Sequence, residues 1–210
     1  MMKYKHIVFD VDGTLLDTEY AVLHSLQDTI SHYLNKQIPM EELNFALGIP
    51  GENALLELGI EDVKDACKFW NVRMHEYLHH IRLFDGISEM LELLHEKGLK
   101  LGIVTSKTKE EYENDFVPYG VDRYFDTVIC VEDTPNHKPH PDPLFAYLER
   151  NDVSADEVIY IGDTEYDCQC ARSAGVDFGL ALWGCCKPDD IKCKYKFSDP
   201  SIVLNEYDER

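Results

Sequence analysis

Asp10-Val11-Asp12-Gly13-Thr14 follows the largely apolar run Tyr4-Lys5-His6-Ile7-Val8-Phe9 near the start of the chain. A run of β-branched and aromatic residues that ends in Asp and Gly predicts a buried strand that stops at a loop. Carboxylates two residues apart on extended backbone point to opposite faces, and Gly13 permits the turn that brings them together. Asp10 and Asp12 are therefore predicted to converge on one reacting centre. An acidic turn without chemistry has the same pattern, so residues farther along the chain must decide.

The bulk composition limits the class of protein. With 210 residues, the chain can form one large core, or a core with a small inserted unit. We expect a cytoplasmic protein, because the sequence has neither an apolar run of about 18 residues nor a signal peptide. The net charge of −20 repels phosphates of nucleic acids and anionic lipids, so we expect neither as a partner. We expect a monomer or a homodimer.

The cysteines do not indicate a framework of disulfide bonds. Their number, seven, is odd and their spacing is irregular, which is typical of reduced thiols in the cytosol. Cys185, Cys186 and Cys193 lie close in sequence but lack the paired C-x-x-C spacing of a zinc site. We therefore expect no metal at this cluster.

The segment between Thr18 and Arg82 has helical periodicity and no strand pattern. Apolar residues recur at helical spacing over Val22–Leu34 and Glu61–Ile81, and shorter helices are expected at Glu41–Leu47 and Glu52–Leu58. The sequence thus predicts an all-helical cap domain, residues 18–82, inserted into a catalytic core formed by residues 1–17 and 83–210.

From Phe84 onward, predicted helices and strands alternate. The expected strands are Leu99–Val104, Thr127–Val131, Val158–Ile161 and Phe178–Trp183. A helix capped by Ser88 and ended at Gly98 precedes the first of them, and a last helix from Pro200 follows the fourth. The helices between the strands are expected over Lys109–Val117, Pro143–Arg150 and Glu165–Ala174. This alternation predicts an α/β fold, a Rossmann-like doubly wound parallel sheet.

Reactive side chains follow four of the predicted strands. In parallel sheets, ligands bind beyond the carboxyl ends of the strands, so these side chains are expected at one edge. They occur in the segments 10–12, 105–107, 138–143 and 162–167. An acidic turn after one strand is common, whereas four reactive groups at one sheet edge indicate a site.

These groups suit phosphoryl transfer. Asp10 is the predicted nucleophile, which forms an aspartyl phosphate, and Asp12 protonates the leaving oxygen and then activates water. The phosphoryl oxygens need hydrogen-bond donors and positive charge. The candidate phosphate-binding residues are Gly13, Thr105, Ser106 and Lys138.

Two further acids complete the candidate site. Asp163 and Asp10 offer the hard oxygen ligands that Mg²⁺ prefers. Asp167, one helical turn after Asp163, is expected to bind a metal-bound water or to orient Lys138. Taken singly, Thr105 is also compatible with a helix cap, Lys138 with a loop lysine and the two acids with the charged start of a helix.

The chain resembles the haloacid dehalogenase superfamily, in particular its phosphoglycolate phosphatase-like branch. Four stretches carry the resemblance, and the likeness covers nearly the whole chain: Asp10–Glu19, Val104–Lys107, Lys138–Pro143 and Gly162–Asp167. The resemblance implies a Mg²⁺-dependent phosphatase with an aspartyl-phosphate intermediate. It also implies Asp10, Asp163 and the backbone carbonyl of Asp12 as metal ligands. The dehalogenases lack a carboxylate at the position of Asp12, so its presence favours phosphate chemistry.

His75-Glu76-Tyr77-Leu78-His79 matches the H-E-x-x-H pattern of zinc proteases on a predicted helix. The extension typical of one large class of these proteases is missing, because Arg82 stands where its glycine would be. The helix also already has an apolar face through Met74, Tyr77 and Ile81. A plain cap-helix surface is therefore favoured over a zinc site.

Two alternatives keep the fold but change the function. A sugar phosphomutase of the β-phosphoglucomutase type needs cap cations for a second phosphate, yet no Lys or Arg lies between Lys36 and Lys64. A non-catalytic binding protein on the same scaffold is disfavoured because all the expected catalytic groups are present. The same lack of cations disfavours phosphoglycolate and pyrophosphate, unless Lys107, Arg73 or Arg82 reaches their second anionic group. The cap turn is apolar with one acid and one amide, which favours a small polar alcohol, such as a sugar or nucleoside, as the leaving group of a phosphomonoester. The candidate cap residues for contacting it are Gly48, Ile49, Gly51, Glu52 and Asn53.

Overall fold

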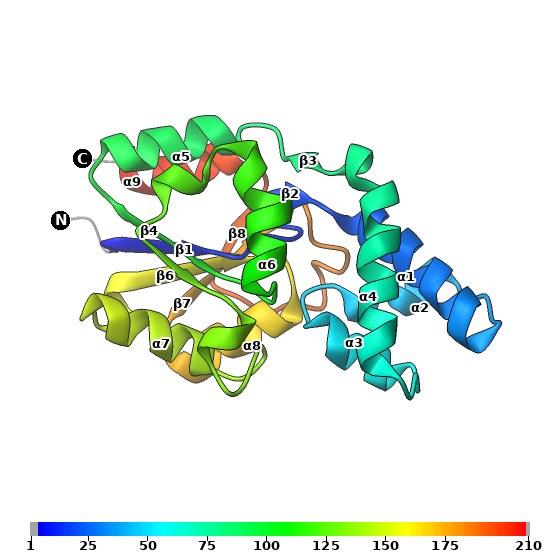
Figure 1. The fold of residues 1–210 in the computed structure, drawn as a ribbon. Helices are drawn as coiled ribbons and strands as arrows, with labels where there is room; N and C mark the ends of the chain where they lie inside the picture. The colour runs from blue at the N-terminus through cyan, green and yellow to red at the C-terminus, as the bar shows by residue number, and fades with distance from the viewer. Residues whose placement is uncertain (1–3, 209–210) are drawn as a thin grey trace.

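A parallel sheet with helices on both faces adjoins a smaller helical unit in the computed structural model, which describes residues 4–208 (Figure 1). Its six strands lie in the order β5-β4-β1-β6-β7-β8, and every neighbouring pair is parallel. From β1 the chain moves outward through β4 and β5, then returns to β6 and continues to the other edge. The strands are β1 (His6–Phe9), β4 (Lys100–Val104), β5 (Thr127–Ile129), β6 (Val158–Gly162), β7 (Asp177–Ala181) and β8 (Tyr195–Phe197). The Rossmann-like fold class expected from the sequence is confirmed, with its reversal point between β1 and β6.

Both faces of the sheet are covered. Helices α5 (Ile87–Glu96) and α9 (Pro200–Asp208) lie on one face, and α7 (Asp142–Asn151) and α8 (Glu165–Ala174) lie on the other (Figure 1). Along β1, Phe9 belongs to the first apolar core and Val8 to the second, as the alternation of side chains along a strand requires. The strands are therefore buried on both sides, which explains their continuous apolar sequences.

The helical unit has an apolar core of its own. It is made of α1 (Glu19–Leu34), α2 (Met40–Leu43), α3 (Gly51–Glu57) and α4 (Val63–Glu76). Leu26, Leu55 and Trp70 are among its buried residues. The sheet and this unit are joined through two short antiparallel strands, β2 (Leu16–Asp17) and β3 (Arg82–Leu83). This ribbon was not predicted, since two-residue strands leave no periodicity in the sequence.

The helix expected over Glu61–Ile81 is shorter in the structure. Helix α4 ends at Glu76, and a 3₁₀ turn over Leu78–His80 follows. Tyr77 N–H donates to Met74 O at 3.0 Å, which tightens the backbone at this end. His75 and His79 are therefore not one turn apart on a continuous α-helix, as the zinc pattern requires.

Two other helical predictions were wrong in detail. The helix after Phe84 begins at Ile87, directly after Gly86 with φ 85°, so Ser88 lies inside the helix and does not cap it. The helix expected over Lys109–Val117 is irregular: α6 covers only Lys109–Glu111, a π-helical turn spans Tyr112–Phe116, and a 3₁₀ turn spans Val117–Tyr119. Pro118 cannot donate a backbone hydrogen bond, so a regular helix cannot continue through it.

The sheet edge near the C-terminus also differs from the prediction. Strand β7 ends at Ala181, and Trp183 beyond it donates its indole N–H to Thr14 O at 2.8 Å. Strand β8 was not predicted, because its sequence Tyr-Lys-Phe is short and alternates with charge, as edge strands often do. Within residues 4–208, no helix has both the length and the apolar composition needed to cross a membrane.

Candidate active site

Asp10 and Asp12 lie in the turn that follows β1. Asp10 is 1% exposed, and its N–H donates to Ile161 O at 2.9 Å, which fixes the end of β1 to β6. Gly13 has φ 75°, and a Cβ at this position would lie 2.2 Å from Asp163 Oδ2. Only glycine allows both this backbone conformation and the close approach of Asp163.

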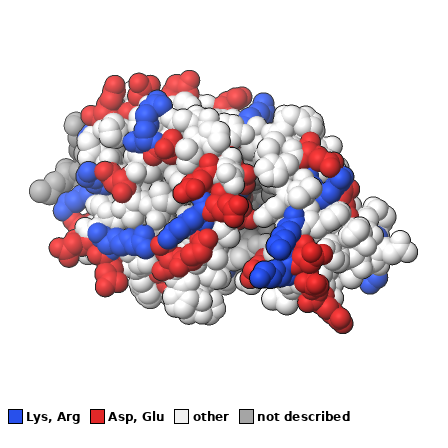
Figure 2. Space-filling view, in the orientation of Figure 1, with Lys and Arg blue, Asp and Glu red and all other residues white. Residues whose placement is uncertain are grey.

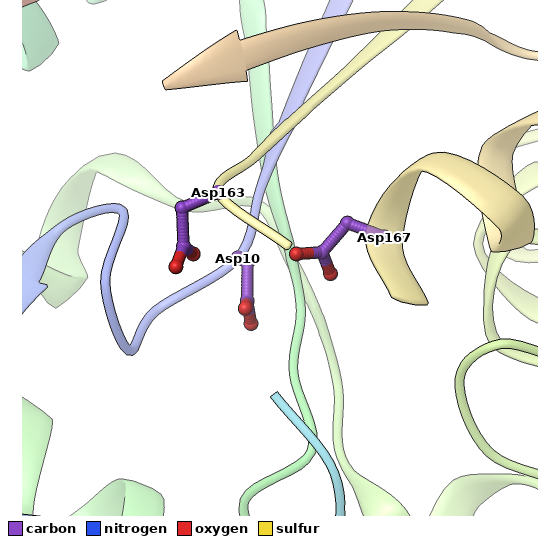
Figure 3. A group of neighbouring side chains, drawn as sticks. All are labelled: Asp10, Asp163 and Asp167. Carbon is purple, nitrogen blue, oxygen red and sulfur yellow. The ribbon is translucent and has the colours of Figure 1, made fainter. Parts of the chain in front are cut away.

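Three carboxylates from separate elements meet at this edge (Figure 3). One oxygen each of Asp10, Asp163 and Asp167 lies within 4.8 Å of the others. Asp10 follows β1, Asp163 follows β6, and Asp167 lies in the first turn of α8. The expected convergence of strand ends therefore occurs for these three residues.

The surroundings of the three acids disfavour their charged forms. Burial raises the pKa of Asp10 to about 7, an effect that Lys138 opposes and that Asp167 and Asp12 reinforce. Burial, followed by the charges of Asp167 and Asp10, raises the pKa of Asp163 well above its usual value. Thr14 donates to Asp163 Oδ1 at 2.9 Å, which fixes that carboxyl group.

Lys138 pairs with two of the acids. Its Nζ lies 2.9 Å from Asp10 Oδ2 and 2.7 Å from Asp167 Oδ1, and its side chain is 1% exposed. Burial alone would lower the pKa of Lys138, but these two carboxylates raise it above its usual value, so it stays charged. The Tyr160 hydroxyl accepts from Lys138 at 3.3 Å and lies 2.9 Å from Asp167 Oδ1.

The donor set fits a divalent cation. One lysine faces three carboxylates, which leaves a net charge of −2 when all three are ionised. Asp10 Oδ2 is paired with Lys138, whereas Asp10 Oδ1 is buried without a hydrogen-bond partner among the described residues. Carboxylate oxygens are the ligands that Mg²⁺ prefers. The residues present therefore fit this ion.

The remaining predicted residues of the core lie close by. Thr105 is buried at the end of β4, where its Oγ1 accepts from Lys107 N–H at 3.2 Å. Ser106 donates its hydroxyl to Gly48 O, in the helical unit, at 2.9 Å. Thr164 caps α8 and donates its N–H to Asp167 Oδ2 at 3.0 Å, which orients that carboxylate toward Lys138.

A cavity of about 520 Å³ lies between the sheet edge and the helical unit. Figure 2 shows a hollow between the two parts, with acidic side chains at its edge. The structure places these predicted residues on its wall: Asp10, Asp12, Gly13, Ser106, Asp163, Gly48, Ile49, Gly51, Glu52 and Asn53. Thr105, Lys138 and Asp167 are buried beside it and are not among the lining residues.

Sequence reasoning missed Thr14 and Tyr160. Thr14 directly follows the turn glycine, and its contact with Asp163 spans 149 positions, which no local pattern reveals. Tyr160 lies in an otherwise aliphatic strand, and its lone phenol among apolar side chains was the available signal.

A Rossmann-like core with carboxylates at its reversal point and a helical cap over the resulting cavity defines a class of α/β hydrolases. Residues 7–181 match the family model of the haloacid dehalogenase-like hydrolases, and the chain belongs to this family. The resemblance recognised from the sequence is confirmed.

Relatives and solved structures narrow the class further. Pyrophosphatase PpaX of Halalkalibacterium halodurans is 30% identical over 97% of this chain and 93% of its own length. A crystal structure from Lactobacillus plantarum, provisionally named a phosphoglycolate phosphatase, has a TM-score of 0.89 and 32% identity. It covers 98% of this chain and all of its own. The protein is thus a hydrolase of the phosphatase type, acting on phosphate esters.

Proposed function

We propose that the protein is a Mg²⁺-dependent phosphatase that hydrolyses a small phosphomonoester through an aspartyl phosphate on Asp10. The carrying observation is Asp10 Oδ1, a buried oxygen without a hydrogen-bond partner among the described residues, in a carboxylate that lies on the wall of the cavity. A nucleophile must keep such a free oxygen directed at the substrate. The names of the relatives, pyrophosphatase and phosphoglycolate phosphatase, support phosphorus as the centre attacked.

The reaction proceeds in two steps. Asp10 attacks phosphorus while the bond to the leaving oxygen breaks, and Asp12 gives that oxygen a proton. Asp12 then takes a proton from water, which attacks the aspartyl phosphate, releases inorganic phosphate and restores Asp10. Lys138 keeps Asp10 in its charged, nucleophilic form and stabilises negative charge on the phosphoryl oxygens. Gly13, Thr105 and Ser106 are the proposed neighbouring phosphate-binding positions.

Mg²⁺ would be held by Asp10, Asp163 and the backbone carbonyl of Asp12. When bound, the ion neutralises the charge that the phosphoryl group and the acids bring together. Asp167 keeps Lys138 in place through the contact of 2.7 Å and stays behind the cavity wall.

The helical cap, residues 18–82, selects the leaving group in this proposal, while residues 1–17 and 83–210 carry the chemistry. Gly48, Ile49, Gly51, Glu52 and Asn53 line the same cavity as Asp10. Of the described residues on this wall, Lys107 and His137 are basic and nine are acidic. A second phosphate has little support there, which favours hydrolysis of a small polar alcohol ester over mutase chemistry. The cytoplasmic location stays a prediction.

Release of inorganic phosphate from a panel of phosphomonoesters tests this function. The assay compares Mg²⁺ with EDTA, and the native protein with Asp10→Asn, which keeps the shape of the side chain but removes the nucleophile. We expect the native protein to release phosphate in Mg²⁺ but not in EDTA, and Asp10→Asn to release none in either. A folded native protein that releases no phosphate from any ester would contradict the proposal.

A further inference from the structure

A second buried lysine lies beside the other acid of the catalytic pair. Lys107 Nζ is 3.2 Å from Asp12 Oδ1 and 3.3 Å from Asp115 Oδ2, and its side chain is 9% exposed. We infer that Lys107 and Asp115 position the Asp12 carboxyl for proton transfer to the leaving group. This inference rests on the proposed function, in which Asp12 carries that proton.

The backbone of Lys107 is held on both sides. Its N–H donates to Thr105 Oγ1 at 3.2 Å, and its carbonyl accepts from Val131 N–H at 3.0 Å. The segment after β4 is thereby tied to the segment after β5. The long lysine side chain therefore starts from a fixed point and reaches Asp12 across the cavity wall, on which both residues lie.

Asp115 owes its position to an irregular backbone. It lies in the π-helical turn Tyr112–Phe116, which inserts an extra residue per turn and rotates the side chains that follow. Phe116, next to it, is fully buried in the core of the sheet and anchors the turn. Such single π-turns occur frequently at functional sites, and here the turn brings an acid against Lys107.

The three groups form a chain along the cavity wall, on which all of them lie. Asp115 pairs with Lys107, and the lysine holds Asp12 Oδ1, a buried oxygen that has no other partner among the described residues. Burial alone would lower the pKa of Lys107, but Asp12 and Asp115 outweigh this effect and keep the lysine charged. A carboxyl group that can rotate freely would transfer its proton less often, because geometry must be kept within about 1 Å for full rate.

Substrates with different leaving groups can show whether Lys107 and Asp115 position Asp12 or have another role in the protein. The 4-nitrophenolate of 4-nitrophenyl phosphate departs without a proton, whereas the alkoxide of glycerol 3-phosphate needs one. Removing the proton donor should therefore lower kcat/KM, which reports the first step, for the second ester alone. A fall in kcat on both esters is expected as well, because Asp12 also activates the water of the second step. We would measure kcat and KM for both esters in Mg²⁺ with Lys107→Met, Asp115→Asn and, as the reference for a lost proton donor, Asp12→Asn.

We expect Lys107→Met to lower kcat/KM for glycerol 3-phosphate by about 10–100-fold, less than the roughly 10²–10⁴-fold contribution of general acid catalysis, because the variant displaces Asp12 and does not remove it. For 4-nitrophenyl phosphate the change should stay within about threefold, and Asp115→Asn should follow the same pattern more weakly. Lys109→Met is the matched control, because this exposed lysine pairs with Asp133 away from Asp12, and both esters should be unaffected.

Three outcomes would overturn the inference. Equal losses of kcat/KM on both esters would indicate a structural or phosphate-binding role for Lys107. A rise in KM with unchanged kcat would indicate that Lys107 binds the leaving group. An unchanged kcat/KM for glycerol 3-phosphate in both Lys107→Met and Asp115→Asn would show that Asp12 needs no positioning by these residues. If Lys107→Met does not fold, as judged by circular dichroism, Asp115→Asn carries the test alone. Inactivity of the native protein on these two esters and on every other ester of the panel contradicts the proposed function instead.

Discussion

Lys138 and Lys107 have the same pattern of partners but lie at different depths. Each lies between two aspartates, one from the turn after β1 and one from a helical element: Asp10 and Asp167 for Lys138, Asp12 and Asp115 for Lys107. The side chain of Lys138 is 1% exposed, with partners at 2% and 0%, whereas the partners of Lys107 are 24% and 14% exposed. Because water reaches the second set, its charges cost less to bury. The comparison distinguishes the buried cluster around Lys138, which stabilises the core, from the cluster around Lys107, which faces the cavity.

The largest effect is expected from Lys138→Met. This change leaves Asp10, Asp163 and Asp167 buried without their cation, which should lower the free energy of unfolding by about 3–5 kcal/mol. Phosphate release should also be lost. Urea unfolding in EDTA measures the first effect. Lys100→Met serves as the control, because it removes only a surface pair with Asp126 and should cost less than about 1 kcal/mol.

Mg²⁺ should stabilise the fold through Asp10 and Asp163, which lie in the cluster around Lys138, and the gain in stability should depend on pH. The pKa values of Asp10 and Asp163 are raised in the folded state, so the metal-free protein loses stability as the pH rises from near 3.8 through about 7. Mg²⁺ at about 100 times its Kd should restore about 2.7 kcal/mol. We therefore expect a larger gain in Tm from Mg²⁺ at pH 8 than at pH 5.

Thermal unfolding with Mg²⁺ or EDTA at the two pH values checks this prediction. Asp163→Asn should reduce the gain at pH 8, since it removes a proposed ligand. An equal gain at both pH values would show that protons and metal do not compete at these carboxylates.

Removing the other lysine should destabilise the fold less. Lys107→Met leaves Asp12 and Asp115 without their cation, but both reach water, so we expect a loss of about 1–2 kcal/mol in the free energy of unfolding. The same urea titration measures it. A loss as large as that of Lys138→Met would remove the distinction between the two clusters.

The cavity side can be tested further at Gly48, in the cap turn. It has φ 84°, and a Cβ there would lie 2.9 Å from Thr164 Cγ2. Gly48→Ala should therefore push the cap away from the core and raise KM by about tenfold, equivalent to about 1.4 kcal/mol. Gly59→Ala is a close control, because Gly59 has φ 78° with nothing within 4 Å of its Cβ. It should carry a similar backbone strain without the rise in KM.

The smallest effect is expected from Ser106→Ala. It removes the hydrogen bond to Gly48 O, whose net contribution is about 1 kcal/mol, so KM should rise less than about fivefold. Steady-state kinetics on the best ester of the panel measures this change. A fall in kcat with unchanged KM would instead show that the proposed contact of Ser106 with the phosphoryl group outweighs its hydrogen bond to Gly48.

Sequence alone predicted the cluster around Lys138 far better than the cluster around Lys107. Asp10, Lys138 and Asp163 each follow a strand whose apolar sequence is easy to recognise, and parallel strands bring their carboxyl ends together. The convergence of these groups could thus be expected before the geometry was known. Their catalytic roles stay predictions until turnover is measured.

The contact of Lys107 with Asp12 and Asp115 could not be predicted in the same way. On a regular helix over Lys109–Val117, Asp115 would point elsewhere, and the π-turn that redirects it has no sequence pattern. The sequence suggested Lys107 only as part of the short stretch after β4 and as a cation that could reach a second anionic group of the substrate. Packing of Phe116 against the sheet, a tertiary effect, decides the local backbone here.

The two-residue strands β2 and β3 make the cap an exchangeable module. Asp17 and Arg82 are paired neighbours, so the cap leaves and re-enters the core at one point, as the loop of a hairpin does. The entropic cost of closing a loop grows only slowly with its length, so the core tolerates inserts of very different size at this point. A cap of another size could therefore be joined between Asp17 and Arg82 while the aspartates of the core keep their places, which would change the proposed choice of substrate and leave the proposed reaction as it is.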